Sequence, residues 1–138
     1  MEGAKREERV FASREDEISY QIIGAAIEVH RALGGPGLLE SVYEEALVWE
    51  LMHKGLCVER QLEAPIQYKG HQLASQLRVD LLVEKLVIVE NKAVVTYNPI
   101  FEAQTLTYLR LMNLRLGLVI NFGEKFVKRV VHRVVNGL

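Results

Sequence analysis

The stretch that decides the fold is RVDLLVEKLVIVENK, residues 78–92. It is typical of two apolar strands joined by a short turn, with Asp80 on the first strand and Glu90 and Lys92 on the second. Charged side chains are costly in such apolar segments unless they are paired or bind a metal. Glu90 and Lys92 are two apart and so share a face. Two carboxylates able to hold a divalent cation, with an ammonium beside them, favour metal-dependent phosphodiester chemistry.

The pairing of these two strands tests the metal hypothesis. A two-residue loop would place Asp80 opposite Val89 and turn Glu90 to the other face. Asp80 lies opposite Glu90 only if Val83 pairs with Val87, which needs an odd loop or a bulge. In that register Leu82 and Ile88 continue the face of the acids, and the opposite face carries Val79, Leu81, Val83, Val87 and Val89. The alternative is that Asp80, Glu90 and Lys92 form a structural ion pair at a strand end.

Outward from this hairpin, the sequence predicts the order α-α-β-β-β-α-β-β. Apolar spacing, the glycine break at 34–37 and the Asn98-Pro99 start signal predict helices over 16–33, 38–54 and 98–112. Strands are predicted over 57–68, 71–83, 86–94, 116–121 and 125–135. The fold class is therefore α/β (α+β), a central mixed sheet flanked by helices, in a single domain over 16–138 after a flexible tail over 1–15. The second helix is expected to bury the stripe Leu39, Val42, Ala46 and Trp49.

Composition limits the function classes. The chain has 138 residues and a net charge of -1, and a protein that grips long DNA alone is usually basic. Strong standalone duplex binding is thus not expected, whereas a small catalytic module acting on ends or short substrates is compatible with this charge. No apolar run approaches a membrane span, so no membrane partner is expected. The single cysteine, Cys57, favours a reducing cytoplasm.

Other polar residues fall at suggestive spacings. Glu40, Tyr43 and Glu44 share one flank of the second helix, a pattern that alone is typical of a solvated face. Gln104 and Tyr108 are neighbours one turn apart on the third helix. His30 ends the first helix, where it could touch a phosphate or assist a general base, or simply complement the helix dipole. A mild basic edge near the C-terminus, either a nucleic-acid contact or a solvated strand face, consists of Lys125, Lys128, Arg129 and Arg133.

These motifs together resemble a known family. The segment GLLESVY, residues 37–43, matches the Gly-x-x-Glu-x-x-Tyr signature of the bacterial and archaeal GxxExxY family. The pattern Asp80…Glu90-x-Lys92 followed by Gln104-x-x-x-Tyr108 is similar to the core of the PD-(D/E)XK nuclease superfamily, in its RecB-like and lambda-exonuclease-like branch. The resemblance spans residues 18–134 and includes the segment LVINFG over 118–123.

The resemblance implies a restriction-endonuclease-like core with a Mg²⁺ or Mn²⁺ site. It assigns the metal to Asp80, Glu90 and the backbone carbonyl of Asn91, with Glu40 as an extra acidic group and Lys92 as the catalytic lysine. On the substrate side it implies Gln104 and Tyr108, with Tyr43 and His30 as further candidates. The chain departs from the usual pattern at Val79, where proline is common, and at Asn91, where an apolar residue is usual and only the carbonyl is expected to matter.

Three function hypotheses follow. The first is a metal-dependent nuclease that hydrolyses phosphodiester bonds of nucleic acid, DNA rather than RNA. The second is a nucleic-acid-binding or assembly module that keeps the site but is inactive without a partner. The third is a metal-binding protein whose acids serve stability. A homodimer is a further expectation, because many small proteins of such folds pair.

Overall fold

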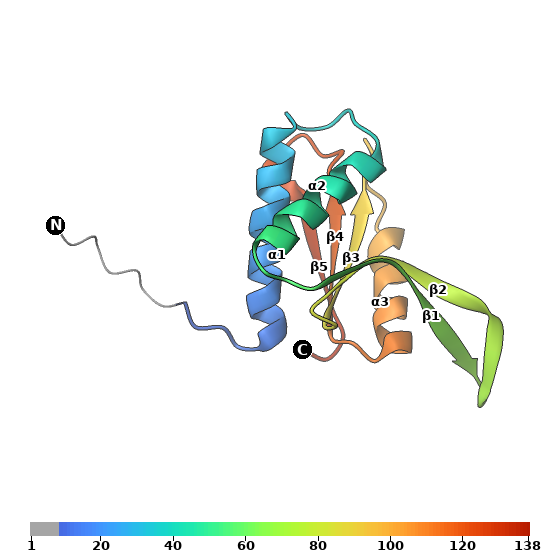
Figure 1. The fold of residues 1–138 in the computed structure, drawn as a ribbon. Coiled ribbons are helices and arrows are strands. Elements are labelled where there is room, and N and C mark those ends of the chain that lie inside the picture. The colour runs from blue at the N-terminus through green and yellow to red at the C-terminus, as the bar shows by residue number, and fades with distance from the viewer. Residues whose placement is uncertain (1–8) are drawn as a thin grey trace.

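A computed structural model describes residues 9–138 (Figure 1). Residues 1–8 of the expected N-terminal tail lie outside the described residues. Helix α1 (Arg14–Ala32) begins two residues before the predicted start. The Ser13 hydroxyl accepts a hydrogen bond from the Asp16 N–H at 3.0 Å and caps the helix. Acidic residues in the first turn and His30 and Arg31 in the last complement the helix dipole.

The sheet has five strands in the spatial order β1-β2-β3-β4-β5. They are β1 (Val58–Tyr68), β2 (His71–Val83), β3 (Val87–Lys92), β4 (Leu116–Asn121) and β5 (Val131–Val135). Only β3 and β4 pair in parallel, and helix α3 (Ile100–Met112) makes the crossover between them. The predicted fold class and element order, a mixed sheet flanked by helices, are confirmed.

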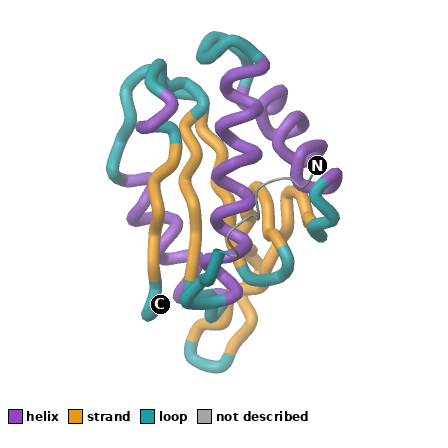
Figure 2. Tube along the Cα trace, turned by 90° about the vertical axis from the view of Figure 1, so that its left-hand side faces the viewer, coloured by secondary structure: helices purple, strands orange, loops and turns teal. Residues whose placement is uncertain are grey.

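Helices cover both faces of the sheet (Figure 2). Helices α1 and α2 (Glu40–His53) pack on one face, in a cluster that includes Leu81, Val89 and Leu118. Helix α3 packs on the other face through Leu109, against Ile88 and other apolar residues. Strands β3 and β4 are thus buried from both sides, which explains their continuous apolar sequence.

Strands β2 and β3 pair in the register that the metal hypothesis requires. Val83 pairs with Val87, and Leu81 pairs with Val89. The loop between them has Glu84 and Lys85 at φ 53° and 56°, and the Glu84 carboxylate accepts the Cys57 N–H at 2.7 Å. The odd loop therefore puts positions 80 and 90 on the same face of the sheet.

The face assigned to Val79 was wrong. Val79 packs in the α3 cluster, whereas Leu81, two residues along, packs in the α1–α2 cluster. The change falls opposite Gln61 of β1, which has φ 49° and lies outside the paired register. Simple alternation fails here because the β1–β2 ribbon bends away from the rest of the sheet, as Figure 1 shows.

The predicted buried stripe of α2 was also wrong. Leu39 and Trp49 are exposed, and the buried face instead carries Tyr43, Leu47 and Leu51. The helix has apolar residues on all sides, so periodicity alone does not select a face. The loop before the helix sets its rotation, as described below.

Two boundaries near the ends of elements also differ. The predicted last strand over 125–135 is shorter, because a 3-10 turn, η1 (Val127–Arg129), precedes β5. Glu124 accepts the backbone N–H of Lys125 at 3.0 Å and so favours a turn there. At α3, Pro99 rather than Asn98 occupies the cap position, although the Asn98 side chain still accepts the Ile100 N–H. Among the described residues, no helix is long and apolar enough to cross a membrane.

Candidate active site

Strands β2 and β3 separate at Asp80. Their backbone pairing stops at Leu81 and Val89, while β3 continues beside β4 as far as Lys92. Past that point the Asp80 carboxylate, rather than a β2 carbonyl, accepts the Asn91 N–H at 2.8 Å. The side chain thus satisfies a backbone donor at the place where the strands diverge.

Glu90 lies beside Asp80 in this opening. Its side chain is buried, and its pKa is raised to about 9, first by burial and then by the charge and hydrogen bonding of Asp80. Lys92 partly offsets this rise. Among the described residues, no hydrogen-bond partner reaches the buried Glu90 Oε1. A carboxyl pair held this close is unfavourable when both are charged, unless a cation lies between them.

Lys92 follows on the same strand and face. Its Nζ lies 4.7 Å from the centre of the Phe101 ring, a cation–π contact. Within residues 9–138 it makes no salt bridge at 4.0 Å or less. The alternative of a closed structural ion pair is therefore not what the structure has: the ammonium remains available near the carboxylates.

Glu40 joins the group from the other side of the opening. It is the first residue of α2, and its pKa is raised by partial burial and by Asp80, with a smaller contribution from Glu44 and an opposing one from Lys92. The charges of Asp80 and Lys92 therefore shift the pKa of Glu40 as they shift the pKa of Glu90. Glu40 of α2 thus lies within electrostatic range of Asp80 and Lys92, although the described acids do not form a three-carboxylate metal cluster.

Gln104 and Tyr108 form the α3 border of this group. The Gln104 amide donates to the Tyr108 hydroxyl at 2.8 Å. The pKa of Tyr108 is raised by its burial and by Glu90, while the bond to Gln104 lowers it. Tyr108 thus lies close to Glu90, and Gln104 extends from it toward solvent.

The donor set fits a hard divalent cation. No group of three or more His, Cys, Asp or Glu side chains in the described part of the chain is arranged to hold a metal. The set at the strand opening has two side-chain carboxylates, those of Asp80 and Glu90, and so needs a main-chain carbonyl or water oxygens besides. Mg²⁺ accepts such a set, since it binds through one or two carboxylates and keeps several waters. The unpartnered Glu90 Oε1 is an oxygen that such an ion would satisfy.

A buried hydrogen-bond network behind the carboxylates was missed from sequence. Glu44 is buried, not solvated as predicted, and accepts from Arg60 at 3.1 Å and from Gln61 at 3.0 Å. Gln61 also reaches Asp80 at 3.4 Å, and the Asn91 side chain donates to Glu44 at 3.4 Å. The expectation that only the backbone of Asn91 matters is therefore wrong. The sole sequence signal was the spacing of Glu44 one turn after Glu40.

Tyr43 fixes the loop before α2, and His30 contacts the turn after β4. The Tyr43 hydroxyl donates to the Gly35 carbonyl at 2.7 Å and accepts the Leu38 N–H at 3.1 Å. His30 is buried, and its Nε2 lies 2.6 Å from the Glu124 carbonyl oxygen. Gly37, at φ 120°, makes the turn that puts Glu40 at the start of α2. The Tyr43 contacts explain the Gly-x-x-Glu-x-x-Tyr spacing, and the side chains of Tyr43 and His30 are both buried.

Contacts made by residues 121–123 fix the position of the backbone at Lys92 and just after it. The Asn121 side chain accepts the Val94 N–H at 3.0 Å and donates to the Val94 carbonyl at 3.1 Å. Gly123 lies so close that a Cβ there would be 2.3 Å from the Val94 carbonyl oxygen. The Phe122 N–H also donates to the Lys92 carbonyl at 2.8 Å. The NFG sequence at 121–123 thus determines where β3 ends and Lys92 lies.

Comparison with known proteins agrees with this geometry. The family model of the PD-(D/E)XK nuclease superfamily matches residues 16–134, which is most of the chain and includes every residue of the carboxylate group. Neither the curated proteins nor the solved structures include a match to the chain. With the fold, the carboxylate pair and the adjacent lysine in place, the protein belongs to the PD-(D/E)XK nuclease superfamily.

Proposed function

We propose that the protein is a divalent-metal-dependent nuclease that hydrolyses phosphodiester bonds in DNA. The observation that carries the proposal is the meeting of Asp80 and Glu90 at the strand opening, with Lys92 beside them and without a salt bridge of its own among the described residues. A structural role would favour closed ion pairs, whereas this group combines an unpartnered carboxylate oxygen with an available ammonium.

The metal in this proposal is Mg²⁺ or Mn²⁺, held by Asp80, Glu90 and the Asn91 carbonyl, with Glu40 as a further acidic group. When bound, the cation supplies Lewis-acid polarisation of the phosphate and lowers the pKa of water in the site. The Lys92 ammonium would orient the attacking water or stabilise the charge that develops on the phosphate. Gln104 and Tyr108 would contact the nucleic acid on the α3 side. Glu90 must lose its proton to bind the ion, so metal affinity should rise with pH.

Three finer assignments belong to the proposal. The Gly-x-x-Glu-x-x-Tyr segment supports placement in the GxxExxY group, near RecB-like and lambda-exonuclease-like enzymes. The same branch supports DNA over RNA as substrate. A cytoplasmic location remains a prediction from the single cysteine.

The test is cleavage of single- and double-stranded DNA by purified protein with Mg²⁺, with Mn²⁺ and with EDTA. We expect metal-dependent cleavage that falls about 100-fold or more in Lys92→Ala, as for loss of a group that stabilises transition-state charge. Asp80→Asn should abolish cleavage and yet fold, because its amide oxygen can still accept the Asn91 N–H. Lys54→Ala, at an exposed lysine that follows α2 at the end away from Glu40, is the matched control and should retain full activity.

Activity that persists in both Lys92→Ala and Asp80→Asn would belong to a contaminant and contradict the proposal. Calorimetric titration with Mn²⁺ separates a stability role from catalysis. Binding that Asp80→Asn abolishes, in a protein that cleaves nothing, would mean that the acids form a metal site without nuclease function.

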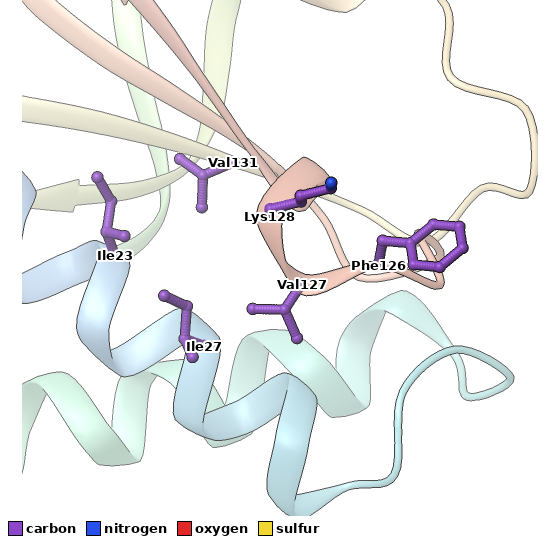
Figure 3. Close-up of a pocket in the computed structure, with 6 residues that line it drawn as sticks. All are labelled: Ile23, Ile27, Phe126, Val127, Lys128 and Val131. Atoms are coloured by element: carbon purple, nitrogen blue, oxygen red, sulfur yellow. The ribbon is translucent and has the colours of Figure 1, made fainter.

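A second candidate function is a nucleic-acid-binding or assembly module that needs a partner, including a second copy of the chain. Apolar surface on α1 and α2 favours it. Ile23 and Ile27 of α1 line a pocket with Val127 and Val131, and no residue of the carboxylate group lines it (Figure 3). Trp49 and Met52 of α2 are exposed as well.

Light scattering across concentrations tests the homodimer, with Ile27→Glu as the disrupting variant. The partner hypothesis expects a dimer that Ile27→Glu dissociates, or a protein that binds DNA but cleaves none alone. A monomer that cleaves DNA at full rate would rule out the second candidate.

A further inference from the structure

The β1–β2 ribbon extends well beyond the body of the protein. Strands β1 and β2 have 11 and 13 residues, whereas β3 and β4 have six each. Figure 1 shows the ribbon projecting past α3, with its turn far from the sheet. Here the arm means residues 63–78, the part of the ribbon beyond the bend at Gln61 and Asp80.

Most of the arm lies outside the two apolar clusters. Leu62 and Val79 beside the bend contact the α3 cluster, and Ala64 and Leu77 at the base of the arm are buried. From residue 65 to residue 76 no side chain is buried, and Tyr68 and Leu73 are exposed near the tip. A two-stranded ribbon without a buried face is only marginally stable in water, so the length of this outer part is explained better by a partner than by the core.

The charge of the arm differs from that of the whole chain. Residues 63–78 contain Lys69 and Arg78 as basic residues and Glu63 as the single acid, which pairs across the strands with Arg78. From residue 64 to the tip and back to 77, no acid occurs, although the chain as a whole is slightly acidic. The remaining polar side chains are largely amides: Gln67, Gln72 and Gln76. This surface complements a phosphate backbone and the hydrogen-bonding edges of bases.

The base of the arm is tied to the carboxylate group. Arg78 donates from Nε to the Gln61 side-chain oxygen at 2.7 Å, and the Gln61 amide reaches Asp80 at 3.4 Å. A nucleic acid bound along the arm would therefore extend to the carboxylate group at Asp80. From Asp80 to the tip at His71 is at most about 30 Å at 3.3 Å per residue, which is about nine base pairs.

We propose that the arm lies along double-stranded DNA next to the bond to be cut, with Lys69 on a phosphate and Gln67 and Gln72 in the major groove. This inference rests on the proposed nuclease function and names its substrate form. A B-form major groove admits a two-stranded ribbon, whereas the A-form groove of RNA is too deep and narrow. The arm has a net charge of +1, from Lys69 and Arg78 against Glu63, so we expect duplex binding that is weak and sensitive to salt.

The tip offers a variant that preserves folding. Lys69 and Gly70 lie in the turn at φ 49° and 79°. Asn-Gly is strongly favoured in such turns, so Lys69→Asn removes the charge and keeps the turn. Lys85→Asn is the matched control, because Lys85 is likewise an exposed lysine in a hairpin turn, at φ 56°, and lies outside both the arm and the basic edge.

The experiment measures binding of a labelled 20-base-pair DNA duplex without divalent cations, so that no cleavage occurs. Lys69→Asn should weaken binding about three- to tenfold at low salt and reduce the slope of log affinity against log salt by about 1. Gln67→Ala combined with Gln72→Ala should also weaken binding, and Lys85→Asn should leave it unchanged. A single strand of the same sequence, or an RNA duplex, should bind more weakly and respond little to Lys69→Asn.

The outcomes separate the arm from the nuclease proposal. No duplex binding by the wild type, equal effects of both lysine variants, or equal dependence of single strands on Lys69 would each overturn the arm proposal. Cleavage that is absent in the wild type, together with Lys69-dependent duplex binding, would overturn the nuclease and keep the arm. In an active enzyme, Lys69→Asn should slow cleavage of long duplexes and leave substrates too short to reach the tip unchanged.

Discussion

The β3–β4 pair and the arm are both made of paired strands, yet they have opposite surroundings. All of β4 and nearly all of β3 are buried between helices, and their backbone pairing is regular and parallel. The arm has solvent around most of its residues and an irregular register between Pro65 and Gln67. The carboxylate group lies at the boundary of these regions. There β2 diverges from β3 at Asp80, while Glu90 stays paired with β4, and that divergence opens the site.

The largest test of this contrast is truncation of one leucine in each region. Leu118→Ala, in the centre of β4, should lower the free energy of unfolding by about 3–4 kcal/mol, because it leaves a cavity between packed helices. Leu73→Ala, in the arm, should cost less than about 1 kcal/mol, since the side chain is already partly in water. Urea unfolding followed by circular dichroism measures both. Similar losses would mean that the arm is packed as the core is.

The next test concerns the close contact that fixes the end of β3. Gly123→Ala would force a Cβ within 2.3 Å of the Val94 carbonyl oxygen and should cost about 2–3 kcal/mol. It should also lower activity, because Lys92 lies just before the displaced segment. Gly24→Ala is the matched control: with nothing within 4 Å of its Cβ, in the middle of α1, it should stabilise by about 0.5–1 kcal/mol. An unchanged melting temperature in Gly123→Ala would contradict the view that the close contact between Gly123 and Val94 fixes the end of β3.

The third test uses the proton on Glu90. Its pKa is raised from 4.5 to about 9 on folding, so the native metal-free protein keeps a proton that the unfolded chain has lost across this range. The stability from this group is full below about pH 4.5 and is lost as pH rises through about 9, by up to about 1.4 kcal/mol per pH unit. From pH 6 to 8, two pH units at nearly this slope, we expect a loss of about 2–3 kcal/mol in EDTA. Denaturant titrations should find this dependence nearly absent in Glu90→Gln.

The smallest expected effect is at the network behind the site. Glu44→Gln keeps the shape of the side chain but removes the charge that accepts from Arg60, and should cost about 1 kcal/mol. The kcat of DNA cleavage should fall a few-fold with little change in KM, because Glu44 positions Asn91 and Gln61 without touching substrate. The neighbouring Glu45→Gln, at an exposed position, is the control and should change stability by less than about 0.5 kcal/mol. If both variants change stability and activity equally, Glu44 does not help to position the residues of the carboxylate group.

The sequence by itself determined the elements and the chemistry-bearing residues near the hairpin. Strands over 71–83 and 116–121 followed from local patterns, and the structure has them at the predicted positions. The pairing of Val83 with Val87 also followed, once both acids were required on one face. These features depend on alternation and turn chemistry, which act over a few residues.

Only the tertiary structure decided which face each helix buries and which polar groups serve the fold. Trp49 lies outside and Tyr43 inside because the loop at Gly37 rotates α2, and no short-range pattern encodes that rotation. Glu44 is buried because Arg60, Gln61 and Asn91 reach it from strands distant in sequence. Burial of a charge is decided by such partners, which chain folding brings together and which local spacing cannot reveal.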